Sequence, residues 1–157
     1  MWLTNDTQTA TITFDLGSVQ TINQLVIWNY NERTYNQANN TDYSYRGVKN
    51  FSLLADNTPN PTSLIGAYTL ARNTMPLATT FAGINDYGMD NTGTAQTIDL
   101  SSPVTARYFA FAVTSSHTTT LDNYTCLSEV RFDTIPETSS VALLGPGLVG
   151  FISRRRR

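Results

Sequence analysis

The sequence predicts an all-β protein, built as an antiparallel sandwich of short strands and long loops. Two observations support this fold class. Several short segments alternate between apolar and polar residues, which is typical of half-buried strands, and no stretch before residue 138 keeps a helical period over ten residues. The chain of 157 residues has room for one domain, which we place at residues 1–133, and for a tail at residues 134–157.

The first predicted strand covers residues 9–16, in which every second residue is apolar. Glycine and serine at residues 17–18 predict a turn, and the β-branched and aromatic run at residues 22–30 predicts a second strand. We expect residues 30–47 to form a polar loop.

Four further strands are predicted after this loop. They cover residues 48–55, 96–100, 107–114 and 127–132. The sequence DNTPNP at residues 56–61 closes the first of them, since proline and asparagine favour turns. Cys126 is the single cysteine, which excludes an intrachain disulfide, and we interpret it as a small buried apolar residue.

Five segments of this pattern follow one another at suitable spacing. They are ITFDLG (residues 12–17), INQLVIWNYNE (22–32), RGVKNFSLL (46–54), ARYFAFAV (106–113) and LSEVRF (127–132). Together they resemble the discoidin (coagulation factor type C) family over about residues 2–132. The resemblance implies a jelly-roll sandwich, the fold that this family shares with galactose-binding-like carbohydrate modules.

The start of the chain is unusual in this comparison. Residues 2–4 resemble the tryptophan segment that follows the first strand in the discoidin family. The resemblance therefore implies that the family's first strand, with a loop that often holds a structural calcium ion, lies upstream of Met1. Residues 1–5 also lack the basic start and apolar run of a signal peptide, so we expect a start codon assigned too late or a truncated gene product.

The polar loop after the second strand is the preferred candidate for a ligand site. A sugar presents an apolar ring face and a rim of hydroxyls, so its site needs an aromatic platform with a few fixed donors and acceptors. The carbohydrate modules that share this fold use loops at one end of the sandwich in this way. The candidate ligand-binding residues are Asn29, Asn31, Glu32, Tyr35, Tyr43, Arg46 and, on a second loop, His117. The alternative is a solvated loop in which Arg46 only pins the chain to the core.

Catalysis is not favoured by the sequence. His117 follows Ser115 and Ser116 and precedes Asp122, but no motif brings a nucleophile and a base within about 3 Å. Residues 85–91 (NDYGMDN) could supply oxygen ligands to calcium, yet they lack the order of a helix-loop-helix calcium site and also fit a plain turn. We therefore predict no enzyme and no cofactor, with a structural calcium ion left open.

Charge limits the possible partners. Residues 1–133 contain six basic and eleven acidic residues, a formal charge of −5. Such a domain has no electrostatic footprint for nucleic acid, so we expect none as a partner. Its many threonine, asparagine, serine and tyrosine residues suit a partner rich in hydroxyl groups.

The tail has a layout of three parts. Pro136 and Glu137 come first, residues 138–153 are uncharged, and four arginines end the chain: Arg154, Arg155, Arg156 and Arg157. As a helix, the apolar part would span about 24 Å, which is short against the roughly 30 Å of a bilayer core. Arginines at the far end would stay on the cytoplasmic side and place the domain outside.

This layout resembles the PEP-CTERM sorting signals of bacterial surface and secreted proteins, although Thr138 stands where the second proline of the Val-Pro-Glu-Pro box is expected. The resemblance implies export, a transient inner-membrane tail, cleavage near Pro136 and Glu137 by an exosortase-type protease, and a final place at the cell surface or outside the cell. The alternative is a C-terminal strand or hairpin with a basic end.

The sequence therefore predicts an exported, noncatalytic binding module for extracellular polysaccharide or cell-surface glycan. The alternative is a structural surface or biofilm-matrix protein without a defined ligand. A saturable interaction with a sugar separates the two.

Overall fold

The computed structural model describes residues 1–4, 7–31, 33–36, 39–73, 94–118 and 123–135, with the backbone alone at residues 33–36 and 39–42. It confirms the predicted fold class, because these residues form an all-β, antiparallel sandwich. The strands are β1 (Trp2–Leu3), β2 (Ala10–Asn29), β3 (Arg33–Asn36), β4 (Asn39–Asp42), β5 (Val48–Asp56), β6 (Leu64–Thr69), β7 (Gln96–Ser116) and β8 (Cys126–Thr134). A short 3₁₀ helix, η1 (Tyr43–Arg46), lies between β4 and β5.

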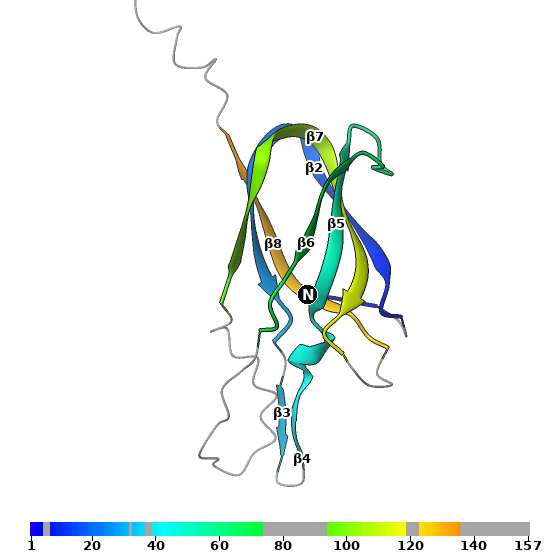
Figure 1. The fold of residues 1–157 in the computed structure, drawn as a ribbon, viewed down its shortest axis with the longest axis vertical. Helices are drawn as coiled ribbons and strands as arrows, with labels where there is room; N and C mark the ends of the chain where they lie inside the picture. The colour runs from blue at the N-terminus through cyan, green and yellow to red at the C-terminus, as the bar shows by residue number, and fades with distance from the viewer. Residues whose placement is uncertain (5–6, 32, 37–38, 74–93, 119–122, 136–157) are drawn as a thin grey trace, which may run out of the picture.

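One bent sheet makes both layers of the sandwich. Its strand order is β1-β8-β2-β7-β5-β6, and all neighbours are antiparallel. Residues 10–15 of β2 pair with residues 108–113 of β7, whereas residues 20–27 pair with residues 96–106. Figure 1 shows the consequence: β2 and β7 arch together over one end of the molecule and run down both layers. We call this end the bend end.

The predicted turn at residues 17–18 is wrong, because β2 continues through it. Gly17 adopts a φ of 79°, which suits glycine, and the pairing register shifts between Asp15 and Gln20. The irregularity bends the strand without reversing it. For the same reason the two strands predicted within residues 96–114 are the two arms of a single strand, β7.

Several further elements were not predicted. β6 pairs with β5 at the edge of the sheet, and its sequence, LIGAYT, does not alternate between apolar and polar residues, so no period-two signal predicts it. The region expected to be a polar loop contains η1 and the hairpin β3–β4, in which Arg33 lies opposite Asp42 and Asn36 opposite Asn39.

The core lies between the two layers and is rich in phenylalanine. The ring of Phe111 stacks on Phe51 at 4.3 Å between centroids and meets Phe14 edge-on at 5.3 Å. Phe132 of β8 meets Phe14 at 5.2 Å, so the rings link both layers. Cys126 is fully buried, as predicted.

The predicted C-terminal helix and sorting motif, residues 136–157, lie outside the described residues. Within the described part of the chain, no helix has the length and apolar character needed to cross a membrane.

Candidate functional site at the loop end

The end of the sandwich opposite the bend gathers the candidate residues. Here β2 and β7 finish, at Asn29 and Ser116, and β5 and β8 begin, at Val48 and Cys126. The hairpin β3–β4 extends away from the sandwich at this end (Figure 1). We call it the loop end.

The helix η1 presents a cluster of tyrosines around an arginine. The guanidinium carbon of Arg46 lies 4.3 Å from the ring centroid of Tyr43 and 5.0 Å from that of Tyr124. The ring centroid of Tyr45 lies 5.9 Å from Arg46 and also 5.9 Å from the guanidinium carbon of Arg72. These distances are within the range of cation–π attraction. We call these five residues the tyrosine–arginine cluster.

Arg72 enters the cluster from the chain after β6. Its Nε donates a hydrogen bond of 2.9 Å to the hydroxyl of Ser44, which is fully buried in η1. Two segments 28 residues apart in sequence are thereby joined. Because Nε is engaged, the plane of the guanidinium group is fixed relative to η1.

Asn29, a predicted ligand residue, holds the loop end together from inside. It is fully buried, its Nδ2 donates to the carbonyl oxygens of Val48 (2.8 Å) and Ala71 (3.0 Å), and its Oδ1 accepts from the backbone N–H of Tyr30 (3.0 Å). A β-carbon on Gly47 would lie only 2.8 Å from this Oδ1. Since the amide is buried and fully used by the backbone, we remove Asn29 from the candidate ligand residues.

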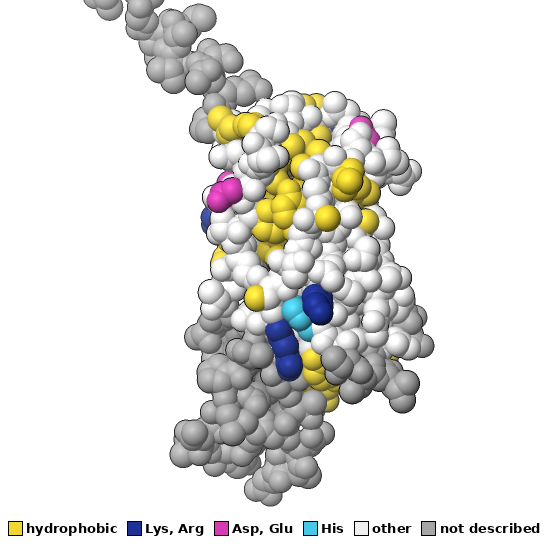
Figure 2. Space-filling model, in the orientation of Figure 1, with side chains coloured by type: hydrophobic (Ala, Val, Ile, Leu, Met, Phe, Trp, Pro, Cys, Tyr) yellow, Lys and Arg dark blue, Asp and Glu magenta, His cyan; other side chains and the backbone are white. Residues whose placement is uncertain are grey.

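His117 is half-buried beside the cluster. Its backbone N–H donates to the carbonyl of Gly47 (3.0 Å), and its Nε2 is buried with no hydrogen-bond partner among the described residues. Burial is the main cause that lowers the pKa of His117, and the charges of Lys49 and Arg72 lower it further, against an opposing effect of the Leu70 carbonyl. The ring is therefore neutral at pH 7. Figure 2 shows the histidine between two basic side chains.

A catalytic triad does not form around this histidine within the described residues. The hydroxyl of Ser115 accepts a hydrogen bond from Asn50 (2.9 Å), and that of Ser116 accepts from the backbone of Thr118 (3.4 Å). Asp122 lies outside the described residues. The hydroxyls of Ser115 and Ser116 thus make local structural hydrogen bonds.

Some predicted positions cannot be placed in the site. Glu32 and residues 85–91 lie outside the described residues, and the side chain of Tyr35 is not described. Asn31 is half-buried at the loop end. In the ranges that the structure describes, no three His, Cys, Asp or Glu side chains gather as a metal site would require.

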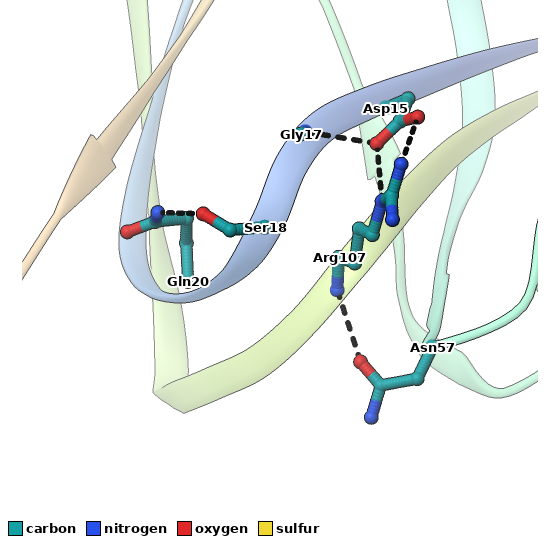
Figure 3. A network of polar contacts seen from close by, with 6 residues as sticks. All are labelled: Asp15, Gly17, Ser18, Gln20, Asn57 and Arg107. Atoms are coloured by element: carbon teal, nitrogen blue, oxygen red, sulfur yellow. Dashed lines mark hydrogen bonds and ion pairs between the residues drawn. The ribbon is translucent and has the colours of Figure 1, made fainter.

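The bend end has its own ion pair, with a structural role (Figure 3). Asp15 receives two hydrogen bonds of 2.8 Å from Arg107 and one of 2.8 Å from the backbone of Gly17. The bond from Arg107 is the largest cause that lowers the pKa of Asp15 to about 2. The backbone N–H of Arg107 donates to Asn57 (3.1 Å), and its guanidinium carbon lies 5.0 Å from the ring of Tyr108. This network pins the two bent strands together.

Sequence reasoning missed Arg72, Lys49 and Tyr124 as members of the loop end. Arg72 follows the unpredicted strand β6, so it had no place in the predicted fold. Tyr124 immediately precedes the buried residues at the start of β8, a position at which its ring reaches the loop end. The sequence did contain one signal for this site, because aromatic and basic residues stand next to the ends of three separate strands.

The described fold is an all-β, antiparallel sandwich of the galactose-binding-like kind. It is similar to the family 32 carbohydrate-binding module (CBM) from C. perfringens NanJ, whose structure was determined in complex with galactose. The TM-score is 0.52 and the identity 12%, over 83% of this chain and 74% of that chain. At this identity the likeness establishes the fold.

The chain belongs to the family described as a domain of unknown function (DUF5000), which matches residues 1–132. Among curated proteins, none matches this chain.

Proposed function

We propose that this protein is a noncatalytic glycan-binding module that recognises sugar at the loop end. The observation that carries the proposal is the tyrosine–arginine cluster beside the unpartnered, buried Nε2 of His117, within the described residues. The similarity of the fold to a carbohydrate-binding module supports it.

The tyrosine rings supply the apolar platform. Arg46 lies over one face of Tyr43 at 4.3 Å, which fixes the ring, and we expect the opposite face to stack on a sugar ring. A tyrosine ring loses little conformational entropy on binding, and its hydroxyl can bond the rim of the sugar. Stacking on Tyr43 then gives the contact, and polar neighbours give the orientation.

His117 is the polar neighbour with the clearest need for a ligand atom. A buried nitrogen without a partner costs about 1–3 kcal/mol, and a sugar hydroxyl or a bound water that reaches Nε2 removes this cost. Being neutral, the ring can both donate and accept hydrogen bonds. Asn31, Glu32 and Tyr35 stay proposed contacts, because they follow Asn29, the loop-end residue of β2, in the sequence.

Binding to immobilised glycans, measured with the full chain, tests this proposal. Tyr43→Ala should weaken saturable binding about two- to tenfold, the effect expected for one aromatic contact. Tyr108→Ala is the matched control, since Tyr108 also lies against an arginine, Arg107, but at the bend end. Equal losses in both variants would assign the effect to stability. Absence of saturable binding to any glycan would favour the structural matrix protein instead.

The absence of catalysis is also part of the proposal. It is supported by the two serines next to His117, because the hydroxyls of Ser115 and Ser116 both take part in local hydrogen bonds. Glycans incubated with the protein should keep their chain length, and new reducing ends would show that it is an enzyme.

We further propose that the domain is exported and sorted through residues 134–157, with the membrane and an exosortase-type protease as partners. The support is the sequence layout around Pro136, Glu137 and the four terminal arginines. Mass spectrometry of the cell-surface form should find a C-terminus near Glu137, and Glu137→Ala should leave the full-length chain in the membrane fraction. Full-length protein at the surface would contradict the proposed cleavage.

A further inference from the structure

We propose that two copies of this chain pair along the first arm of β2, residues 10–15, and form a dimer in which one sheet runs through both copies. We call residues 10–15 the β2 border. The pairing concerns a different part of the molecule from the loop end, and it needs no ligand.

The β2 border is a free edge of the described sandwich. Its residues pair with residues 108–113 of β7 on one side, and no other described segment pairs with them on the other side. Figure 1 shows this arm, in dark blue, at the outside of the sheet. Alternate residues of an edge strand turn their N–H and C=O groups away from their partner, so the β2 border can accept a further strand.

The other edges of the described sandwich carry features that hinder the addition of a strand. β6 has a register shift against β5, which marks a bulge. The arm of β7 at residues 96–106 contains Pro103, and the outer side of β8 carries the exposed charges of Glu129 and Arg131. Bulges, prolines and charges are the usual protection of edge strands against pairing.

The β2 border has none of this protection. Its pairing with β7 runs without a register shift from Ala10 to Asp15, and it contains no proline. Its one charge, Asp15, stands at its end and is paired with Arg107 at 2.8 Å. An edge that is regular, uncharged over five residues and rich in β-branched side chains is therefore open to a partner strand.

The core-facing side chains of the β2 border are less buried than their neighbours in β7. Phe109 and Phe111 of β7 are fully buried, whereas Phe14 and Ile12, which lie opposite them, are partly buried. A further strand at this edge would remove more of their apolar surface from water, which favours association.

The sequence of the β2 border matches a second copy of itself in antiparallel orientation. With the twofold axis at Ile12, each residue lies opposite a residue of the same face, as the strand period of two requires. On the core side, Ile12 meets Ile12, and the small Ala10 meets the large Phe14. On the outer side, the exposed Thr11 meets the exposed Thr13, a pair whose hydroxyls can form a hydrogen bond. We therefore infer that the partner strand comes from a second copy of this chain.

The antiparallel pairing fixes the direction of the two copies. The β2 border runs from the loop end toward the bend end, since Ala10 lies opposite Val113, near the end of β7, and Asp15 lies opposite Tyr108. The two loop ends of the dimer consequently point in opposite directions. If each loop end binds glycan as proposed above, the dimer joins two separate glycan chains.

Sedimentation equilibrium of the full chain tests the pairing. The mass should rise from one chain to two as the concentration is raised from about 10 μM to about 1 mM, because dimerisation follows mass action. Thr11→Lys/Thr13→Lys places like charges opposite each other in both outer pairs, so it should raise the dissociation constant about tenfold or more. The matched control is Ala67→Lys/Thr69→Lys, which puts two lysines at exposed positions of β6, at the other edge of the same layer, and should leave the constant unchanged.

Single cysteines test the register and remain informative if the lysine variant does not fold. A mixture of Thr11→Cys and Thr13→Cys chains should form a disulfide-linked dimer on oxidation, because these two positions face each other. Either variant alone should cross-link about tenfold less, since its two cysteines are then too far apart. The native chain provides the baseline, because Cys126 is fully buried.

Three results would overturn the inference. The first is a chain that stays monomeric up to about 1 mM. The second is a dimer that the lysines on β2 do not weaken, or that the lysines on β6 weaken equally, because the contact then lies elsewhere or depends on charge alone. The third is a cysteine mixture that cross-links no better than either variant alone. Glycan binding enters none of these measurements, so failure of the proposed function would leave the pairing intact.

Discussion

Replacing Asn29 with leucine should destabilise the whole domain. Leucine has a similar volume but removes three hydrogen bonds, of 2.8, 3.0 and 3.0 Å, from a fully buried position. The N–H of Tyr30 and the carbonyls of Val48 and Ala71 would lose these partners. Each unsatisfied buried group costs about 1–3 kcal/mol, and because the backbone can relax partly, we expect a total loss of about 3 kcal/mol.

Urea unfolding followed by tryptophan fluorescence measures this loss, since Trp28 is adjacent in β2. The midpoint should fall while the slope stays constant, which indicates lower stability and an unchanged unfolded state. Asn23→Leu is the matched control, because Asn23 lies exposed in the same strand. Its free energy of unfolding should change by less than about 0.5 kcal/mol.

The result that would refute the reasoning is specific. If Asn29→Leu folds as stably as the native chain and still loses glycan binding, the amide contacts the ligand directly and its assignment as an internal support is wrong.

The remaining predictions concern pH and backbone conformation. The pKa of His117 lies below 6.5 in the fold, so the unfolded chain binds the proton first as the pH falls. The contribution of His117 to stability is therefore present above about pH 6.5 and is lost below it. Urea midpoints should fall over this pH range, and His117→Phe should remove that part of the pH dependence. The pKa of Asp15 is about 2 in the fold against an ordinary value of 3.8, so its pair with Arg107 supports the fold above about pH 4 and is lost on approach to pH 2. In Asp15→Asn, the free energy of unfolding should therefore fall less between these pH values than in the native chain. Gly17→Ala should lower the free energy of unfolding by about 1 kcal/mol, because a φ of 79° strains a residue with a side chain. No clash adds to this cost, since nothing lies within 4 Å of an added methyl group. An unchanged midpoint in a urea titration would show that the bend tolerates any residue.

Periodicity was sufficient to predict the fold class. The alternation in residues 11–16 matches the burial in β2, in which the polar residues are exposed and the apolar ones partly buried. The bend was not predictable in the same way, because Gly17 followed by serine fits a turn as well as a bulge. Which of the two forms depends on pairing with β7, about 90 residues away, and no local signal encodes that register.

The candidate site was predicted in part. The sequence placed Tyr43, Arg46 and His117 among the candidates, and the structure brings all three to the loop end. It could not reveal that Arg72 joins them, since that requires the tertiary contact with Ser44. The polar amide of Asn29 indicated a ligand contact, but it makes hydrogen bonds to the backbone instead. Only its burial, which the sequence does not show, distinguishes a ligand contact from an internal support.

The orientation of β8 has a mechanical consequence. The strand begins at the loop end, and after it the chain leaves at Ile135 near the bend end, where the N–H of Ile135 bonds the carbonyl of Thr21 (2.9 Å) (Figure 1). Tension between a molecule held at the loop end and the C-terminal side of the chain therefore runs lengthwise along β8. Its bonds to β2, which extend from Asn29 to Ile22, are loaded in shear and share the force, whereas a pull across the sheet would open them one after another.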